Sequence, residues 1–97
     1  FTFVGFLPDK PGKRRKAIEG FKDYDHTVVL YVSLWKVEKT IKDCLDILGD
    51  RGACLCRELT KIHEEFVRDK LSGLLKRVGE KRPKGEMLLI LEPAPLD

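Results

Sequence analysis

Apolar residues in this 97-residue chain gather in short runs that charged stretches separate. Four runs have the length of a strand. They span residues 1–7, 26–31, 53–59 and 86–92. The run at 26–31 is continuous and β-branched, which predicts a central strand covered on both faces. The residues expected in the core of these strands are Val28, Val29, Leu30, Leu55, Leu88, Leu89 and Ile90.

Between the second and third runs, apolar residues recur at spacings of three and four. They are Leu34, Val37, Ile41, Cys44, Leu45 and Leu48. This period predicts an amphipathic helix whose apolar face packs on the sheet. Ser33 is the predicted N-cap and Gly49 the predicted stop. Trp35, in the first turn, is expected to pack in the core or at its rim.

Two more helices are expected, one from residue 13 and one capped by Ser72, with a turn at 82–85 after it. Residues 64–71 fit either a short edge strand or a helix. The pattern therefore predicts one domain over residues 1–97, of class α/β (α+β). It has a mixed sheet of about five strands and about three to four packed helices.

Composition adds only broad limits. The chain is 42% hydrophobic and 36% charged, with a net charge of +3 that is too small to establish a nucleic-acid partner. Cys44, Cys54 and Cys56 are expected to be buried free thiols of a reducing cytosol, because neighbouring thiols on one strand face pair poorly. No cysteine or histidine has zinc-site spacing, so no metal is expected. No apolar run is long enough to cross a bilayer.

Lys13, Arg14, Arg15 and Lys16 stand together at the expected start of a helix. Four cations there oppose the helix dipole, and a bound anion such as phosphate would offset that cost. A plain solvated basic turn explains the run equally well.

Groups for catalysis do not stand out. The chain has no P-loop, no GxGxxG and no Ser-His-Asp or Cys-His set, and His26 and His63 are interpreted as structural or solvated. The residues alone indicate an α/β domain with a basic entrance, and no catalytic residue is assigned.

Four phrases, at residues 3–8, 10–17, 57–65 and 84–87, stand in an order typical of one known family. The most specific are Arg-Glu-Leu-Thr-Lys at 57–61 and the basic run at 13–16. The chain resembles the second half of the tetrapyrrole methylase (class III methyltransferase) fold. Within that fold it is most similar to the bacterial ribosomal RNA small-subunit methyltransferase I family.

The resemblance implies a cytoplasmic methyltransferase that uses S-adenosylmethionine (SAM) to methylate a cytidine ribose 2′-OH in small-subunit ribosomal RNA. It also implies two domains with SAM between them, and a homodimer. This chain is then the C-terminal subdomain, inactive without its N-terminal domain. The implied cofactor-binding residues are Tyr31, Val32, Ser33, Arg57 and Glu58. The implied RNA-binding residues are Lys10, Lys13, Arg14, Arg15, Lys16 and Lys61, with residues 10 and 13–16 expected to form an exposed patch.

The chain departs from the family after Tyr31. Val32, Trp35 and Lys36 stand where the family has Glu, His and Arg. An apolar residue after Tyr31 is more similar to porphyrin and corrin methylases. Two alternatives therefore stay open: a tetrapyrrole methylase subdomain, or a non-catalytic RNA-binding module that keeps the fold.

Overall fold

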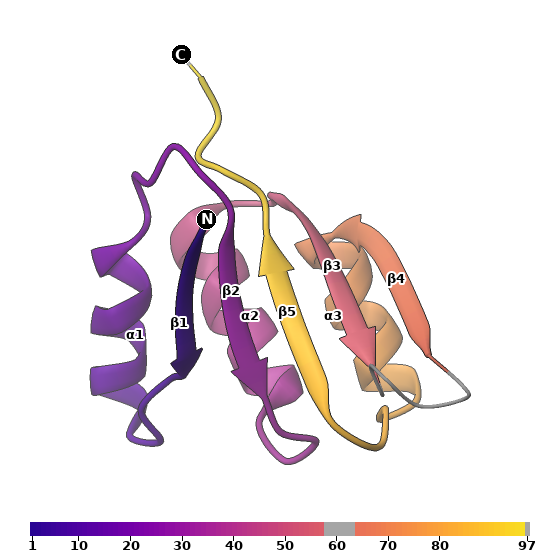
Figure 1. Cartoon of the computed structure of the whole chain (residues 1–97). Helices are drawn as coiled ribbons and strands as arrows, with labels where there is room; N and C mark the ends of the chain where they lie inside the picture. The colour runs from indigo at the N-terminus through magenta and orange to yellow at the C-terminus, as the bar shows by residue number, and fades with distance from the viewer. Residues whose placement is uncertain (58–63, 97) are drawn as a thin grey trace.

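The computed structural model describes residues 1–57 and 64–96, which form one sheet with helices packed on it (Figure 1). The strands are β1 (Thr2–Phe6), β2 (Val28–Val32), β3 (Gly52–Arg57), β4 (Glu65–Lys70) and β5 (Met87–Leu91). The helices are α1 (Pro11–Gly20), α2 (Val37–Leu48) and α3 (Leu71–Glu80). The strand order is β1-β2-β5-β3-β4. The predicted α/β class with a five-stranded mixed sheet is confirmed.

The last strand, β5, lies in the middle of the sheet. It pairs antiparallel with β2 on one side and with β3 on the other, while β1 is parallel to β2 and β4 antiparallel to β3. β2 and β3 therefore run in the same direction, as expected across a helical connection, but they are not neighbours. The ambiguous stretch at 64–71 contains the edge strand β4.

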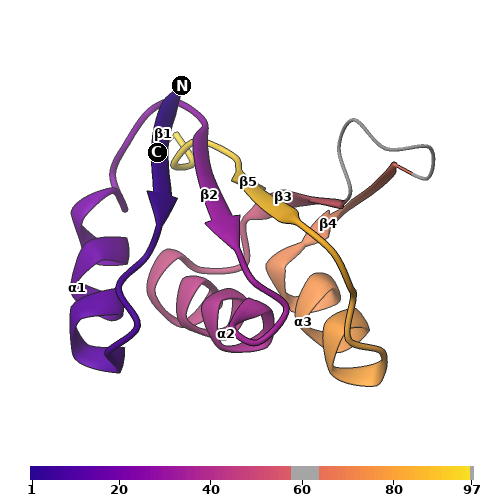
Figure 2. The same cartoon turned by 60° about the horizontal axis from the view of Figure 1, so that its bottom comes forward.

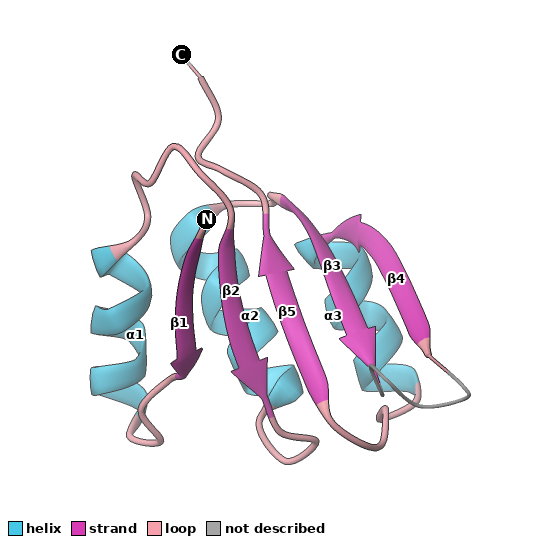
Figure 3. Ribbon diagram, viewed as in Figure 1, coloured by secondary structure: helices cyan, strands magenta, loops and turns pink. Residues whose placement is uncertain are grey.

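The three helices cover one face of the sheet (Figures 2 and 3). Burial therefore alternates along β2: Val28 and Leu30 are buried, Val29 is half-buried and Tyr31 is 45% exposed. The prediction that β2 is covered on both faces is wrong, and the same alternation leaves Leu88 and Ile90 half-buried. The core lies on the helical side. It includes Val28, Leu30, Leu55, Leu89, Leu91, Val37, Ile41, Cys44, Leu48, Leu71, Leu74 and Val78.

The opposite face, which we call the open face, carries aromatic side chains. A bulge shifts the β1–β2 pairing between Phe3 and Gly5, and Gly5 takes a φ of 81°, which glycine tolerates best. Because of the extra residue, Phe3 and Phe6 both contact Tyr31, with ring centroids 5.0 and 5.2 Å apart. Phe66 on β4 adds a further ring that is 54% exposed. An exposed apolar patch of this kind is typical of a contact surface.

The three thiols are free and buried, as predicted. Cys44 faces the core from α2, whereas Cys54 and Cys56 lie on β3 with their Sγ atoms 3.7 Å apart. Burial raises the pKa of Cys44 to about 12. Burial, together with the contact to Cys54, raises the pKa of Cys56 to about 12. Both thiols therefore stay protonated near neutral pH.

Helix ends agree only partly with the predicted caps. Gly49 follows the last residue of α2 with a φ of 81°, as expected for a stop. The predicted cap at Ser33 is wrong. α2 begins at Val37, and Ser33 instead accepts the Lys36 N–H through its carbonyl, at 3.0 Å, in a turn before the helix.

Ser72 is not a cap either, since α3 begins one residue earlier at Leu71. The cap comes from the loop after α2. Asp50 accepts the Ser72 backbone N–H at 2.8 Å and the Ser72 hydroxyl at 2.6 Å. These two bonds hold the pKa of Asp50 below its ordinary value of 3.8, because they favour the carboxylate.

We expect Asp50→Asn to lower the free energy of unfolding near neutral pH, because an amide oxygen accepts these bonds less strongly than a carboxylate. The folded pKa is the lower one, so the carboxylate stabilises fully above pH 3.8 and less as pH falls through the folded pKa. Urea unfolding of both proteins from about pH 7 to about pH 2 measures the difference. Asp23→Asn, at an exposed position, is the control. A difference that does not shrink in acid would contradict this account.

Candidate functional site

Strands β1, β2 and β3 all end at the same edge of the sheet, the lower edge in Figure 1. β1 and β2 end side by side, with Phe6 paired to Tyr31, and their chains then turn away to α1 and α2. A crevice outside the carboxyl ends of such strands is where α/β sheets usually bind ligands.

Two adjoining hollows lie at this edge. The first, of about 360 Å³, is lined by Phe6, Leu7, Pro8, Asp9, Arg14, Tyr31, Val32, Ser33, Lys36 and Thr40. The second, of about 490 Å³, shares Phe6 and residues 31–33 and adds Leu34, Trp35, Gly85, Glu86 and Met87. Tyr31, Val32 and Ser33, three of the residues expected to bind a cofactor, line both hollows, and their role at a cofactor stays a prediction. Aromatic rings with a few hydroxyl and backbone groups are typical of a small-molecule site.

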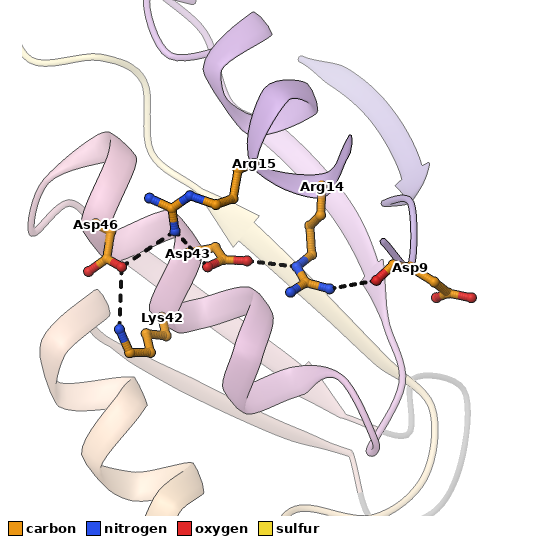
Figure 4. Close-up of polar contacts among 6 residues, drawn as sticks. All are labelled: Asp9, Arg14, Arg15, Lys42, Asp43 and Asp46. Atoms are coloured by element: carbon orange, nitrogen blue, oxygen red, sulfur yellow. Dashed lines mark hydrogen bonds and ion pairs between the residues drawn. The ribbon is translucent and has the colours of Figure 1, made fainter. Parts of the chain in front are cut away.

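Arg14, which lines the first hollow, forms a buried ion pair with Asp43 (Figure 4). Arg14 is 5% exposed, and its Nε donates to Asp43 Oδ2 at 2.7 Å. Its Nη1 donates to the backbone carbonyl of Asp9 at 3.0 Å. Arg14 thus ties α1, α2 and the loop after β1 together, which fixes the shape of the hollow.

The prediction of an exposed basic patch at 13–16 is wrong for Arg14 and only half right for Arg15. Arg15 contacts Asp43 at 2.8 Å and Asp46 at 3.5 Å, and its side chain is 42% exposed. Because α2 supplies these carboxylates, Arg14 and Arg15 do not need an external anion. Lys10, Lys13 and Lys16 are exposed, and their contact with RNA stays a prediction. Lys61 lies outside the described residues.

Arg57 lies on the helical side of the sheet, level with Val32 but with β5 between them. Its Nη1 donates to the Lys84 carbonyl at 3.0 Å and its Nη2 to Glu65 at 3.3 Å. It lines a separate hollow of about 410 Å³. Within residues 1–57 and 64–96, the hollows around Tyr31 do not include Arg57. Its role at a cofactor stays a prediction, and Glu58 lies outside the described residues.

Trp35 is 72% exposed, so the prediction that it packs in the core or at its rim is wrong. The guanidinium of Arg82 lies 5.4 Å from the centre of its ring. Sequence reasoning treated residues 82–85 only as a turn and missed the cations there. Three cations in the four residues 81–84, one turn after Arg77, were the available signal.

Across the described residues, no group of three or more His, Cys, Asp or Glu side chains could hold a metal ion. In the same part of the chain, no helix has the length and apolar character to cross a membrane.

Comparison with known proteins relates nearly the whole chain to a named enzyme. The chain is 42% identical over 92 residues to ribosomal RNA small subunit methyltransferase I of Halalkalibacterium halodurans. It is 36% identical over 91 residues to that of Thermotoga maritima, and 34% over 92 residues to that of Bacillus subtilis. This chain is similar to one region of ribosomal RNA small subunit methyltransferase I. The resemblance inferred from its phrases is confirmed.

The similarity covers 94–95% of this chain but only 32–40% of these relatives, so the chain spans about a third of their length. Among solved structures, cobalt precorrin-4 methyltransferase, a cobalamin biosynthetic enzyme, matches with a TM-score of 0.63. That match covers 94% of this chain and 40% of the other at 15% identity, which shows the shared fold alone. No family model matches the chain.

Proposed function

We propose that this chain is the C-terminal domain of a SAM-dependent methyltransferase that modifies small-subunit ribosomal RNA. The observation that carries the proposal is the 34–42% identity, over nearly the whole chain, to proteins of that name. The hollows at the ends of β1 and β2 support the proposal, because Tyr31, Val32 and Ser33 line both of them.

The residues around these hollows fit a nucleoside-like cofactor. Tyr31 and Phe6 offer aromatic surface, stacked with ring centroids 5.2 Å apart, and Ser33 offers a hydroxyl and backbone groups. SAM would supply an electrophilic methyl group on its sulfonium. These side chains would bind and orient the cofactor, while Arg14, Asp43 and Asp9 hold the loop that shapes the first hollow.

The rest of the longer protein would supply the other wall of the cofactor site. Its relatives are about two to three times as long as this chain, and the aromatic open face offers a surface for that remainder to cover. The isolated 97 residues should therefore bind SAM weakly and be inactive. The homodimer and the cytoplasmic location remain proposals that rest on the resemblance, as does the cytidine 2′-OH as methyl acceptor.

A tetrapyrrole methylase is the second candidate function. It is supported by Val32, the apolar residue after Tyr31 that porphyrin and corrin methylases share. A non-catalytic RNA-binding module is the third, and it would bind RNA without transferring a methyl group.

Methyl transfer from labelled SAM distinguishes the three candidate functions. We expect the full-length protein that contains this chain to methylate small ribosomal subunits that lack the modification. Ser33→Phe, which fills the hollow, should weaken SAM binding by about tenfold, or about 1.4 kcal/mol. Lys39→Phe, at an exposed position on α2, should leave SAM affinity unchanged.

Each negative result of this experiment favours a different conclusion. Methyl transfer to a tetrapyrrole and not to ribosomal subunits would favour the second candidate. RNA binding with no SAM affinity would favour the third. Unchanged SAM affinity in Ser33→Phe would show that the cofactor binds elsewhere.

A further inference from the structure

A second concentration of charge lies at the same edge of the sheet. We call it the Arg57 pocket: the hollow of about 410 Å³ lined by Arg57, Glu65, Arg77, Lys81, Arg82 and Lys84. Leu55, Val67 and Val78 form its apolar floor. Five cations and one carboxylate give this lining a larger net charge than the +3 of the whole chain. The lining of this hollow is therefore strongly positive.

The guanidinium of Arg57 is only partly satisfied. Nη1 and Nη2 donate to Lys84 and Glu65, but Nε is buried and has no hydrogen-bond partner among the described residues. A buried donor without an acceptor is unfavourable. Because Nε is closed to solvent, an anionic oxygen in the pocket would interact with the charge of the guanidinium and with the neighbouring cations.

The dipole of α3 explains only part of this charge. Arg77 lies in the last turn of α3 and complements the negative end of the helix. Arg82 and Lys84 follow the helix and lie in the loop that leads to β5. They line the same hollow as Arg57 without a role in capping the helix.

Trp35 connects this pocket to the cofactor hollows. Its ring lies under Arg82, which lines the Arg57 pocket, while the same indole lines the hollow shared by Tyr31 and Ser33. An exposed indole beside cations suits nucleic acid, because a base can stack on the ring while the backbone meets the charges.

We propose that the Arg57 pocket binds a backbone phosphate of the RNA substrate and that a neighbouring base stacks on Trp35. This inference rests on the proposed function and places the RNA strand across the sheet edge, next to the cofactor hollows. Phosphate contacts position a strand without reading its sequence. The pocket would therefore fix the position of the RNA strand and would not select the nucleotide that is methylated.

The test uses the full-length protein and a single-stranded RNA of about ten nucleotides from the small-subunit sequence. Arg82→Gln with Lys84→Gln should weaken RNA binding about tenfold. The slope of log affinity against log salt should fall by about one unit per lost phosphate contact. SAM affinity should not change. Lys39→Gln with Lys76→Gln is the matched control, because it removes the same charge from exposed positions on α2 and α3.

Trp35→Ala gives an independent measure. Loss of base stacking should weaken RNA binding by about fivefold to a hundredfold, with no change in the salt slope, because no cation is removed. Trp35→Phe should restore most of the affinity, since a smaller ring still stacks.

The proposal is overturned if the Arg82, Lys84 double variant matches the control double variant in affinity and slope. It is also overturned if that variant loses affinity for a polycarboxylate porphyrin while RNA binding stays intact. If the variant loses RNA affinity as expected but the parent protein never methylates ribosomal subunits, the pocket stands and the proposed methyltransferase function fails.

Discussion

Replacing Ile41 with alanine will lower the free energy of unfolding by about 2–5 kcal/mol. Ile41 lies on α2, is 0% exposed and belongs to the core between the helices and the sheet. Truncation removes its transfer free energy and leaves a cavity that the packed strands cannot fill completely. Urea unfolding followed by circular dichroism measures the loss. Fluorescence is the weaker probe, because Trp35, the only tryptophan, is 72% exposed.

Lys42→Ala, one residue further along α2 on its exposed side, is the matched control and should change stability by less than about 0.5 kcal/mol. A loss below about 1 kcal/mol for Ile41→Ala would mean that this face of α2 does not pack on the sheet.

Removing the carboxylate of Asp43 has an effect of similar size. We expect Asp43→Ala to cost about 3 kcal/mol, the lower end of the range for breaking a buried ion pair, because the Asp43 side chain is still 13% exposed. The cost arises mainly from Arg14, whose side chain is 7% exposed and would keep its charge without an anionic partner. Urea unfolding near neutral pH measures it.

Two further variants separate charge from packing. Asp46→Ala removes a neighbouring carboxylate whose contacts, at 3.4 and 3.5 Å, are partly exposed, and should cost less than about 0.5 kcal/mol. Arg14→Met combined with Asp43→Leu removes both charges and should recover most of the stability, since no buried charge is left unpaired. If Asp43→Ala costs no more than Asp46→Ala, the buried pair does not hold α1 to α2.

Local pattern was sufficient for most of the fold. The spacing of Val37, Ile41, Cys44 and Leu48 predicted α2 and its buried face, because helical periodicity depends only on the chain itself. The apolar runs predicted four strands, and the fifth, β4, was ambiguous because only Val67 among its residues is even half-buried. The order of short phrases was enough to identify the resemblance that the relatives confirm.

Only the part of the candidate site that comes from a single strand could be predicted from the sequence. Tyr31, Val32 and Ser33 are consecutive, so the end of β2 carries them to one place. Arg57 was expected beside them but lines another hollow, because β5 lies between β2 and β3. The position of β5 depends on pairing between residues that are 30 or more apart in the chain, and such pairing leaves no local signal in the sequence.

The charged residues likewise differ between their order in the sequence and their contacts in the fold. Lys13 to Lys16 formed one basic run in the sequence, but Arg14 is buried because Asp43, 29 residues later, faces it across the α1–α2 contact. The Arg57 pocket gathers cations from β3, α3 and the following loop, which are joined only by folding.

By itself, then, the sequence determined the class of fold, the buried face of α2, the free thiols and the family resemblance, because these depend on period, composition and order along the chain. The tertiary structure alone decided the central place of β5, the open face and the partners of Arg14 and Arg57. The physical reason is that three helices packed on one side leave alternate strand residues exposed, and that ion pairs form between segments that only strand pairing and helix packing bring together.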